Sequence, residues 1–117
     1  MPWAIGFYGS DEEGCPVQEF LDGLDKPRRA KLVAAIKLLE EQGPALPFPY
    51  SSQVRGKVRE LRAHYGSEHF RLLYFGAPNR AFVLLHALEK RAEKLPGRDI
   101  KLAEKRMGKY LERLEDD

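Results

Sequence analysis

Three stretches of alternating apolar and polar residues follow one another between Gln53 and Lys94, and short turn sequences separate them. The turns are residues 65–68 (YGSE) and 76–79 (GAPN), which are rich in residues that favour chain reversal. Alternation with a period of two is typical of strands that bury one face. Strands joined by turns this short lie antiparallel, so the stretch predicts a three-stranded meander.

Pairing across the two turns predicts which residues share a face of the sheet. The first turn, closed with His64 against His69, gives the further pairs Arg62–Arg71 and Glu60–Leu73. The second turn gives the pairs Phe75–Arg80, His69–His86 and Arg71–Leu84. A slip by two residues would change the partners but keep every side chain on its face.

These pairs predict one apolar face and one divided face. The apolar face holds Leu61, Ala63, Phe70, Leu72, Tyr74, Val83, Leu85 and Ala87. One end of the other face holds the polar residues Glu60, Arg62, His64, His69, Arg71 and His86, with Lys90 joining them if the strand reaches so far. The other end holds Leu73, Phe75, Phe82 and Leu84. Arginines directly opposite each other repel, so stability alone does not favour this pairing.

The remaining elements predict an α+β domain that covers residues 1–117. Residues 3–8 alternate as a strand, and residues 16–42 form two helices, each with a proline in its first turn. Residues 43–56 form a proline-stiffened extended loop that its apolar residues pin to the body. A last helix begins at Pro96. The predicted order is β-α-α-β-β-β-α: an antiparallel sheet with the helical hairpin on one face and the C-terminal helix against the other.

Composition narrows the setting of the chain. Cys15 is the only cysteine, so no disulfide can form within the chain, which indicates a reducing compartment. The sequence has neither an apolar run of about 18 residues nor a signal-like start, so we expect a cytoplasmic protein with no membrane partner. Residues 55–113 carry fifteen basic against seven acidic residues, which favours a polyanionic partner.

The polar half-face allows two interpretations. It is either an ordinary solvated sheet face or a site that binds phosphate and transfers protons, for which cations, imidazoles and a carboxylate are suited. The three histidines do not predict a zinc site, because two fixed cations beside them would repel the metal and the chain has no second thiol. We therefore expect no metal and no cofactor.

Several motifs in this region resemble the phage-derived HigB-like branch of the RelE/HigB toxin superfamily. They are VRELR at 58–62, HFRLLYF at 69–75, VLLHALEKR at 83–91, KLP at 94–96 and AEKRM at 103–107 with Tyr110. The resemblance implies a RelE-like fold and the toxin of a type II toxin–antitoxin pair. Such toxins are typically metal-independent ribonucleases that cut mRNA on the ribosome, and a HigA-like helix-turn-helix antitoxin neutralises them. The branch commonly has an aromatic residue and two lysines where this chain has LEKRA at 88–92.

The resemblance and the face assignment together predict the site residues. The expected catalytic set is Glu60, Arg62, Arg71, His86 and Lys90. The expected RNA-binding set is Arg55, Lys57, His64, Tyr65, His69, Arg91 and Lys94. Glu60 and His64 are candidates for the general base, and His86 and His69 for the general acid. The alternative hypothesis is a non-catalytic module of this fold that uses its basic face to hold an antitoxin or nucleic acid.

Overall fold

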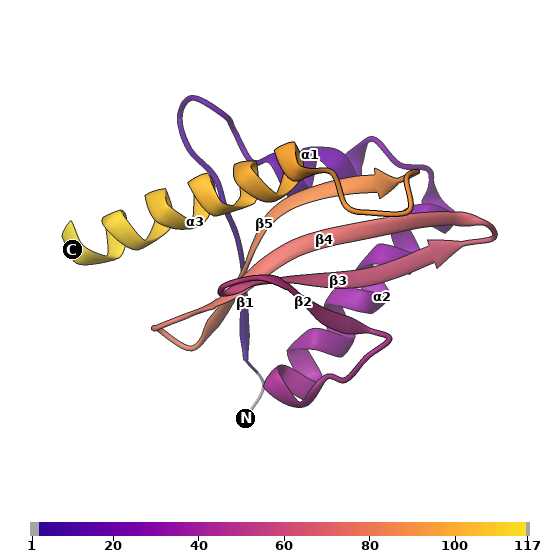
Figure 1. Ribbon diagram of the computed structural model, residues 1–117, viewed down its shortest axis with the longest axis horizontal. Helices are drawn as coiled ribbons and strands as arrows, with labels where there is room; N and C mark the ends of the chain where they lie inside the picture. The colour runs from indigo at the N-terminus through magenta and orange to yellow at the C-terminus, as the bar shows by residue number, and fades with distance from the viewer. Residues whose placement is uncertain (1–2, 117) are drawn as a thin grey trace.

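The computed structural model describes residues 3–116, which form a five-stranded sheet with helices on both faces (Figure 1). The elements are β1 (Ala4–Phe7), α1 (Pro16–Asp22), α2 (Lys26–Gln42), a 3-10 turn (Gly43–Ala45), β2 (Ser51–Arg55), β3 (Val58–Tyr65), β4 (Glu68–Ala77), β5 (Ala81–Lys90) and α3 (Gly97–Asp116). The α+β prediction and the placement of the helical hairpin and α3 on opposite faces are confirmed. No helix among residues 3–116 is long and apolar enough to cross a bilayer.

The sheet is mixed rather than antiparallel, which corrects the sequence prediction. Its strand order is β1-β5-β4-β3-β2, and β1 runs parallel to β5 at one edge with Ala4 opposite Ala81. The pairing of β1 with β5 joins residues about eighty positions apart. Alternation within β1 predicts a strand, but it does not predict which distant strand becomes the neighbour.

The second correction concerns residues 43–56, which are not a loop throughout. The prolines end at Pro49, and Ser51–Arg55 then forms β2, which pairs antiparallel with β3. Gly56, at a φ of 55°, supplies the left-handed backbone that closes this hairpin. This strand was not predicted because its sequence, SSQVR, is mostly polar. A strand at the edge of a sheet needs few apolar residues. Ser51 is nevertheless buried, and its hydroxyl lies 2.6 Å from that of Tyr74.

The predicted register of β3 against β4 is confirmed. His64 lies opposite His69, Arg62 opposite Arg71, and Glu60 opposite Leu73. The turn between them contains Gly66 at a φ of 60°, a backbone conformation that glycine adopts without steric cost.

The predicted register of β4 against β5 is wrong in two respects. The chain reverses at residues 78–80, where Arg80 N donates to Ala77 O at 3.2 Å and Arg80 is left-handed. A type I turn followed by a left-handed residue is a common three-residue hairpin loop. The observed pairs are Phe75–Val83, Leu73–His86, Arg71–Leu88 and His69–Lys90.

A β-bulge at Leu85 is the second difference. Tyr74 pairs with Leu84 and Leu73 with His86, so Leu85 is the extra residue. The bulge exchanges the faces of the residues between it and the turn: Phe82 and Leu84 lie on the hairpin side, and Val83 and Leu85 on the α3 side. Beyond the bulge the predicted parity returns. His86, Leu88 and Lys90 therefore face the α3 side, because the register here is shifted from the predicted one by four residues, an even number.

One buried arginine fastens α3 to the rest of the fold. Arg106 Nε donates to Glu13 Oε1 at 2.9 Å, and its Nη1 donates to Leu85 O at 2.8 Å. The Tyr8 hydroxyl donates to Glu13 Oε2 at 2.9 Å. Arg106 thus links α3 to the bulge and to the loop between β1 and α1. Burial alone would raise the pKa of Glu13, but the hydrogen bonds from Arg106 and Tyr8 and the Arg106 charge outweigh burial and lower it.

The lowered pKa of Glu13 predicts a contribution to stability that depends on pH. This contribution is complete above the ordinary carboxyl value of 4.5 and is lost as the pH falls through the lower pKa of the folded state. Glu13→Gln should therefore lower the free energy of unfolding at pH 7 and flatten its decline in acid. Urea unfolding at pH 3 to 7 measures both effects. Glu12→Gln, at an exposed neighbouring position, should keep the wild-type pH profile.

Candidate active site

A cavity of about 230 Å³ opens where β3 and β4 extend beyond the end of β2. It is lined by Pro49, Tyr50, Arg62, Ala63, His64, His69 and Arg71. Four residues that the sequence analysis singled out therefore meet around one space. The β3–β4 register brings them together, because it sets Arg62 against Arg71 and His64 against His69. The two exposed imidazole rings have centroids 6.2 Å apart.

A carboxylate lies beside the two arginines. Glu60 Oε1 is 3.4 Å from Arg71 Nε, and its Oε2 is 4.0 Å from Arg62 Nε. Ser52, on β2, donates a hydrogen bond to Glu60 Oε2 at 2.8 Å. Strand β2 thus orients the carboxylate, and the carboxylate partly compensates the repulsion between the two guanidinium groups.

Arg71 is buried to an unusual degree for a charged residue. Its side chain is 4% exposed, and its Nη1 donates to Phe70 O at 3.0 Å. Its buried Nε makes no hydrogen bond, although Glu60 is close enough for ionic attraction. Burial lowers the pKa of Arg71, the Glu60 charge acts in the opposite direction, and the nearby Arg62 charge lowers it further. An under-satisfied cation beside an open cavity is suited to an anionic ligand.

His86 lies apart from this cavity, under the first turns of α3. Its Nε2 is 2.7 Å from Asp99 Oδ1, and its Nδ1 is 3.3 Å from Arg106 Nη1. An arginine can only donate, so Nδ1 is the acceptor and the Nε2 proton points to Asp99. Both ring nitrogens are therefore engaged within the fold. The predicted pairing of His86 with His69 is wrong, because the β5 register places Lys90 opposite His69 instead.

The structure does not bring the other predicted residues to the lining of the cavity. Lys90 lies across from His69, with its Nζ donating to Ala92 O at 2.8 Å. Arg55 forms an ion pair with Glu104 at 2.7 Å, and Arg91 forms one with Glu89 at 3.2 Å. Lys57, in the β2–β3 turn, and Lys94, after β5, are exposed.

Tyr65 is on the opposite face of the sheet from the cavity, against the helical hairpin. The guanidinium carbon of Arg28 is 4.6 Å from its ring centroid, and Arg28 also forms an ion pair with Glu68 at 2.6 Å. Side chains alternate between the two faces along β3, so Tyr65 lies on the opposite face from Arg62 and His64. The site therefore does not include the ring of Tyr65.

Two aromatic residues beside the cavity, Phe48 and Tyr50, were not predicted as site residues. The loop before β2 is fixed by Leu46, which is buried as expected, but Phe48 and Tyr50 are 69% and 50% exposed. The prediction that they pin the loop to the body is wrong: residues 47–51 form a turn, in which Tyr50 N and Ser51 N both donate to Pro47 O, and both rings stay exposed. Their position in a proline-rich stretch next to a polar strand was the available signal.

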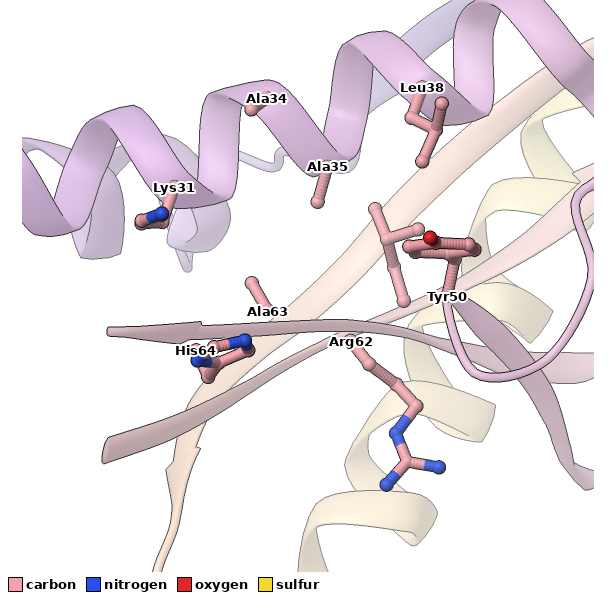
Figure 2. Close-up of a pocket in the computed structure, with 9 residues that line it drawn as sticks. Lys31, Ala34, Ala35, Leu38, Tyr50, Arg62, Ala63 and His64 are labelled. Carbon is pink, nitrogen blue, oxygen red and sulfur yellow. The ribbon is translucent and has the colours of Figure 1, made fainter. Parts of the chain in front are cut away.

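Tyr50 also borders a second hollow, of about 220 Å³, on the α2 side of β3. Figure 2 shows Ala35 and Leu38 of α2 facing Tyr50 across this hollow, while the guanidinium group of Arg62 is turned to the other side of the strand. The guanidinium group of Arg62 therefore belongs to the first cavity, and Tyr50 stands between the two spaces.

The sequence matches the family model of phage-derived Gp49-like proteins over residues 19–108. The chain belongs to this family. Over 107 residues it is also 34% identical to a Mycobacterium tuberculosis protein named "Putative toxin HigB2", a match that covers 86% of this chain and 53% of that protein. The chain thus spans about half the length of the curated relative it matches. The resemblance to the phage-derived HigB-like branch is confirmed.

The matched region of this Gp49-like chain contains every residue that lines the cavity. Among the described residues, no three histidine, cysteine, aspartate or glutamate side chains gather as a set of metal ligands. The cavity is lined by two arginines and two imidazoles, and the carboxylate of Glu60 lies beside it.

The pairing of Glu60 with buried Arg71 predicts a large effect on stability. Glu60→Gln should lower the free energy of unfolding by roughly 3 kcal/mol, because it leaves a buried guanidinium without its counter-charge. Glu104→Gln removes a solvent-screened ion pair at the surface and should cost much less stability. Urea unfolding of both variants at pH 7 gives the comparison. Equal losses would contradict the assigned role of Glu60.

Proposed function

We propose that this chain is the toxin of a type II toxin–antitoxin pair and that it cuts mRNA on the ribosome. The observation that carries the proposal is the convergence of Arg62, Arg71, His64 and His69 on one cavity, with Glu60 adjacent. Membership of the phage-derived Gp49-like family and the similarity to a HigB2 protein support it. The basic balance of residues 55–113 suits a polyanionic substrate.

The proposed reaction uses the 2′-hydroxyl of the RNA as the nucleophile. A base takes its proton, the 2′-oxygen bonds to the neighbouring phosphorus, and the bond from phosphorus to the 5′-oxygen breaks. An acid gives a proton to the leaving 5′-oxygen, so the products are a 2′,3′-cyclic phosphate and a 5′-hydroxyl. Arg62 and Arg71 bind the phosphate and stabilise the charge that grows in the transition state, and Lys90 supports them.

The geometry favours particular groups for the proton transfers. Glu60 is held by Ser52 and Arg71 beside the phosphate-binding groups, which suits a base, and exposed His64 is the second candidate. His69 lines the cavity and is the better candidate for the acid. His86 is held between Asp99 and Arg106, so we assign it the positioning of β5 and α3 rather than proton transfer.

The partners and location follow from the same proposal. A toxin of this kind requires a cognate antitoxin, which we propose to be a HigA-like helix-turn-helix protein. Its substrate, mRNA on the ribosome, places the protein in the cytoplasm. The RNA backbone beyond the cleaved phosphate would contact Arg55, Lys57, Arg91 and Lys94. Arg55 and Arg91 would then exchange their ion pairs with Glu104 and Glu89 for phosphates.

Loss of a phosphate-binding arginine should abolish toxicity. Arg71→Ala and Arg62→Ala are each expected to reduce cleavage of a reporter message roughly 100-fold or more, because they remove transition-state stabilisation. Growth after induction and primer extension on the message measure the effect. Circular dichroism and antitoxin binding check folding, and Arg62→Ala is the safer variant because Arg62 is only partly buried.

Arg113→Ala is the matched control for these variants. Arg113 lies near the far end of α3, where it donates to Gly9 O, so this variant should remain fully toxic. Undiminished growth arrest by a folded Arg62→Ala protein would refute the assignment. Binding of antitoxin or RNA without any cleavage by the wild-type protein would favour the non-catalytic alternative.

Cleavage should survive chelation of divalent ions. The proposal assigns the stabilisation of charge to two arginines, whose fixed charges would repel a metal from the same cavity. Because ribosomes need Mg²⁺, the assay forms the complex first and uses EDTA at a concentration that leaves the ribosomes assembled. Loss of cutting under these conditions, with restoration by added metal, would contradict the arginine mechanism.

A further inference from the structure

The proline-rich segment before β2 carries two aromatic side chains that the fold does not bury. Phe48 is 69% exposed and Tyr50 is 50% exposed, whereas the next most exposed large apolar side chain among residues 3–116, Phe7, is 37% exposed. Exposed aromatic rings contribute little to folding, because the stabilisation comes from the area removed from water. Two of them within three residues, on the rim of a cationic cavity, indicate a surface that contacts a ligand.

Both rings adjoin the groups that would hold phosphate. The guanidinium carbon of Arg62 lies 5.2 Å from the Phe48 ring centroid, so Arg62 occupies one side of this ring. Tyr50 lines the cavity together with Arg62 and Arg71. A nucleotide whose phosphate reaches the arginines would therefore place its base within reach of these two aromatic side chains.

The backbone holds this segment in place. Tyr50 N donates to Pro47 O at 2.9 Å, Ser51 N donates to the same oxygen at 3.1 Å, and Arg62 N donates to Tyr50 O at 2.9 Å. Buried Leu46 anchors the chain on one side, and the pairing of Ser51 with Leu61 fixes it on the other. The aromatic side chains thus project from an ordered backbone, which reduces the entropy lost when a ligand binds.

We propose that Phe48 and Tyr50 form a stacking platform for an RNA base next to the cleaved phosphate. The inference rests on the proposed function and adds the subsite that binds the base. Proteins that bind single-stranded RNA stack its bases on aromatic side chains, and Arg62 against Phe48 adds a cation–π contact to the same surface. Stacking accepts any base but gains more from a larger ring, so the platform favours purines.

Fluorescence of a base analogue tests the platform directly. The probe is a short single-stranded RNA with one central 2-aminopurine and 2′-O-methyl groups throughout, which prevent cleavage. Stacking on the aromatic rings should quench its fluorescence when the wild-type protein binds. Phe48→Ala and Tyr50→Ala should each weaken binding about 10-fold and remove most of the quenching. Tyr50→Phe, which keeps the ring, should restore both.

Two control variants separate stacking from other effects. Phe7→Ala removes an exposed aromatic side chain on β1 and should leave binding and quenching unchanged. Arg62→Ala should reduce the dependence of binding on salt, because it removes a phosphate contact, whereas Phe48→Ala and Tyr50→Ala should keep the wild-type salt dependence. Circular dichroism should show that all the variants are folded.

The outcomes distinguish this proposal from the proposed function. Absence of quenching by the wild-type protein, or full quenching by both alanine variants, would overturn the platform even if the message is still cut. Loss of antitoxin binding by the alanine variants with unchanged RNA binding would also overturn it, since the rings would then belong to a protein interface. Quenching that depends on both rings in a protein that never cuts mRNA would uphold the platform and refute the ribonuclease.

Discussion

The pairing of β3 with β4 is the constraint on which the rest of the structure depends. Strand β4 is hydrogen-bonded on both sides, and most of its side chains are buried on one face or the other. With β4 in place, a slip of β3 by one residue would turn Leu61 away from the helical hairpin and Arg62 towards the apolar core. The hydrophobic core therefore enforces the register that sets the two arginines side by side.

The proximity of these arginines is unfavourable for stability, and the surrounding structure compensates it. Glu60 supplies the opposite charge, and Ser52 holds its carboxylate by a hydrogen bond. Because Arg71 is buried, loss of the Glu60 charge would lower the free energy of unfolding more than at an exposed site. A buried guanidinium with a free Nε is an arrangement that folding alone would not select. It is consistent with a site that keeps binding capacity for an anion, which is how the proposed function uses it.

The sequence predicted what local patterns determine and missed what distant contacts determine. The helical hairpin, α3 and the β3–β4 register were predicted, because capping residues, prolines and the 65–68 turn act locally. The bulge at Leu85 was not, because an apolar run such as FVLLHA does not show where one residue is extra. That omission exchanged the faces of Val83 and Leu84. His86 was assigned to the site because the predicted register paired it with His69, whereas it lies opposite Leu73 and its ring contacts Asp99 and Arg106 beneath α3.

The anchoring of the segment before β2 limits how the site can change during evolution. Only residues 47–50 separate buried Leu46 from Ser51, which is already paired in the sheet. An insertion or deletion here would displace both aromatic rings or break the pairing of β2, and β2 carries the serine that orients Glu60. Replacement of side chains at positions 48 and 50 disturbs neither. Divergence among relatives in this region is therefore expected in residue identity at constant length.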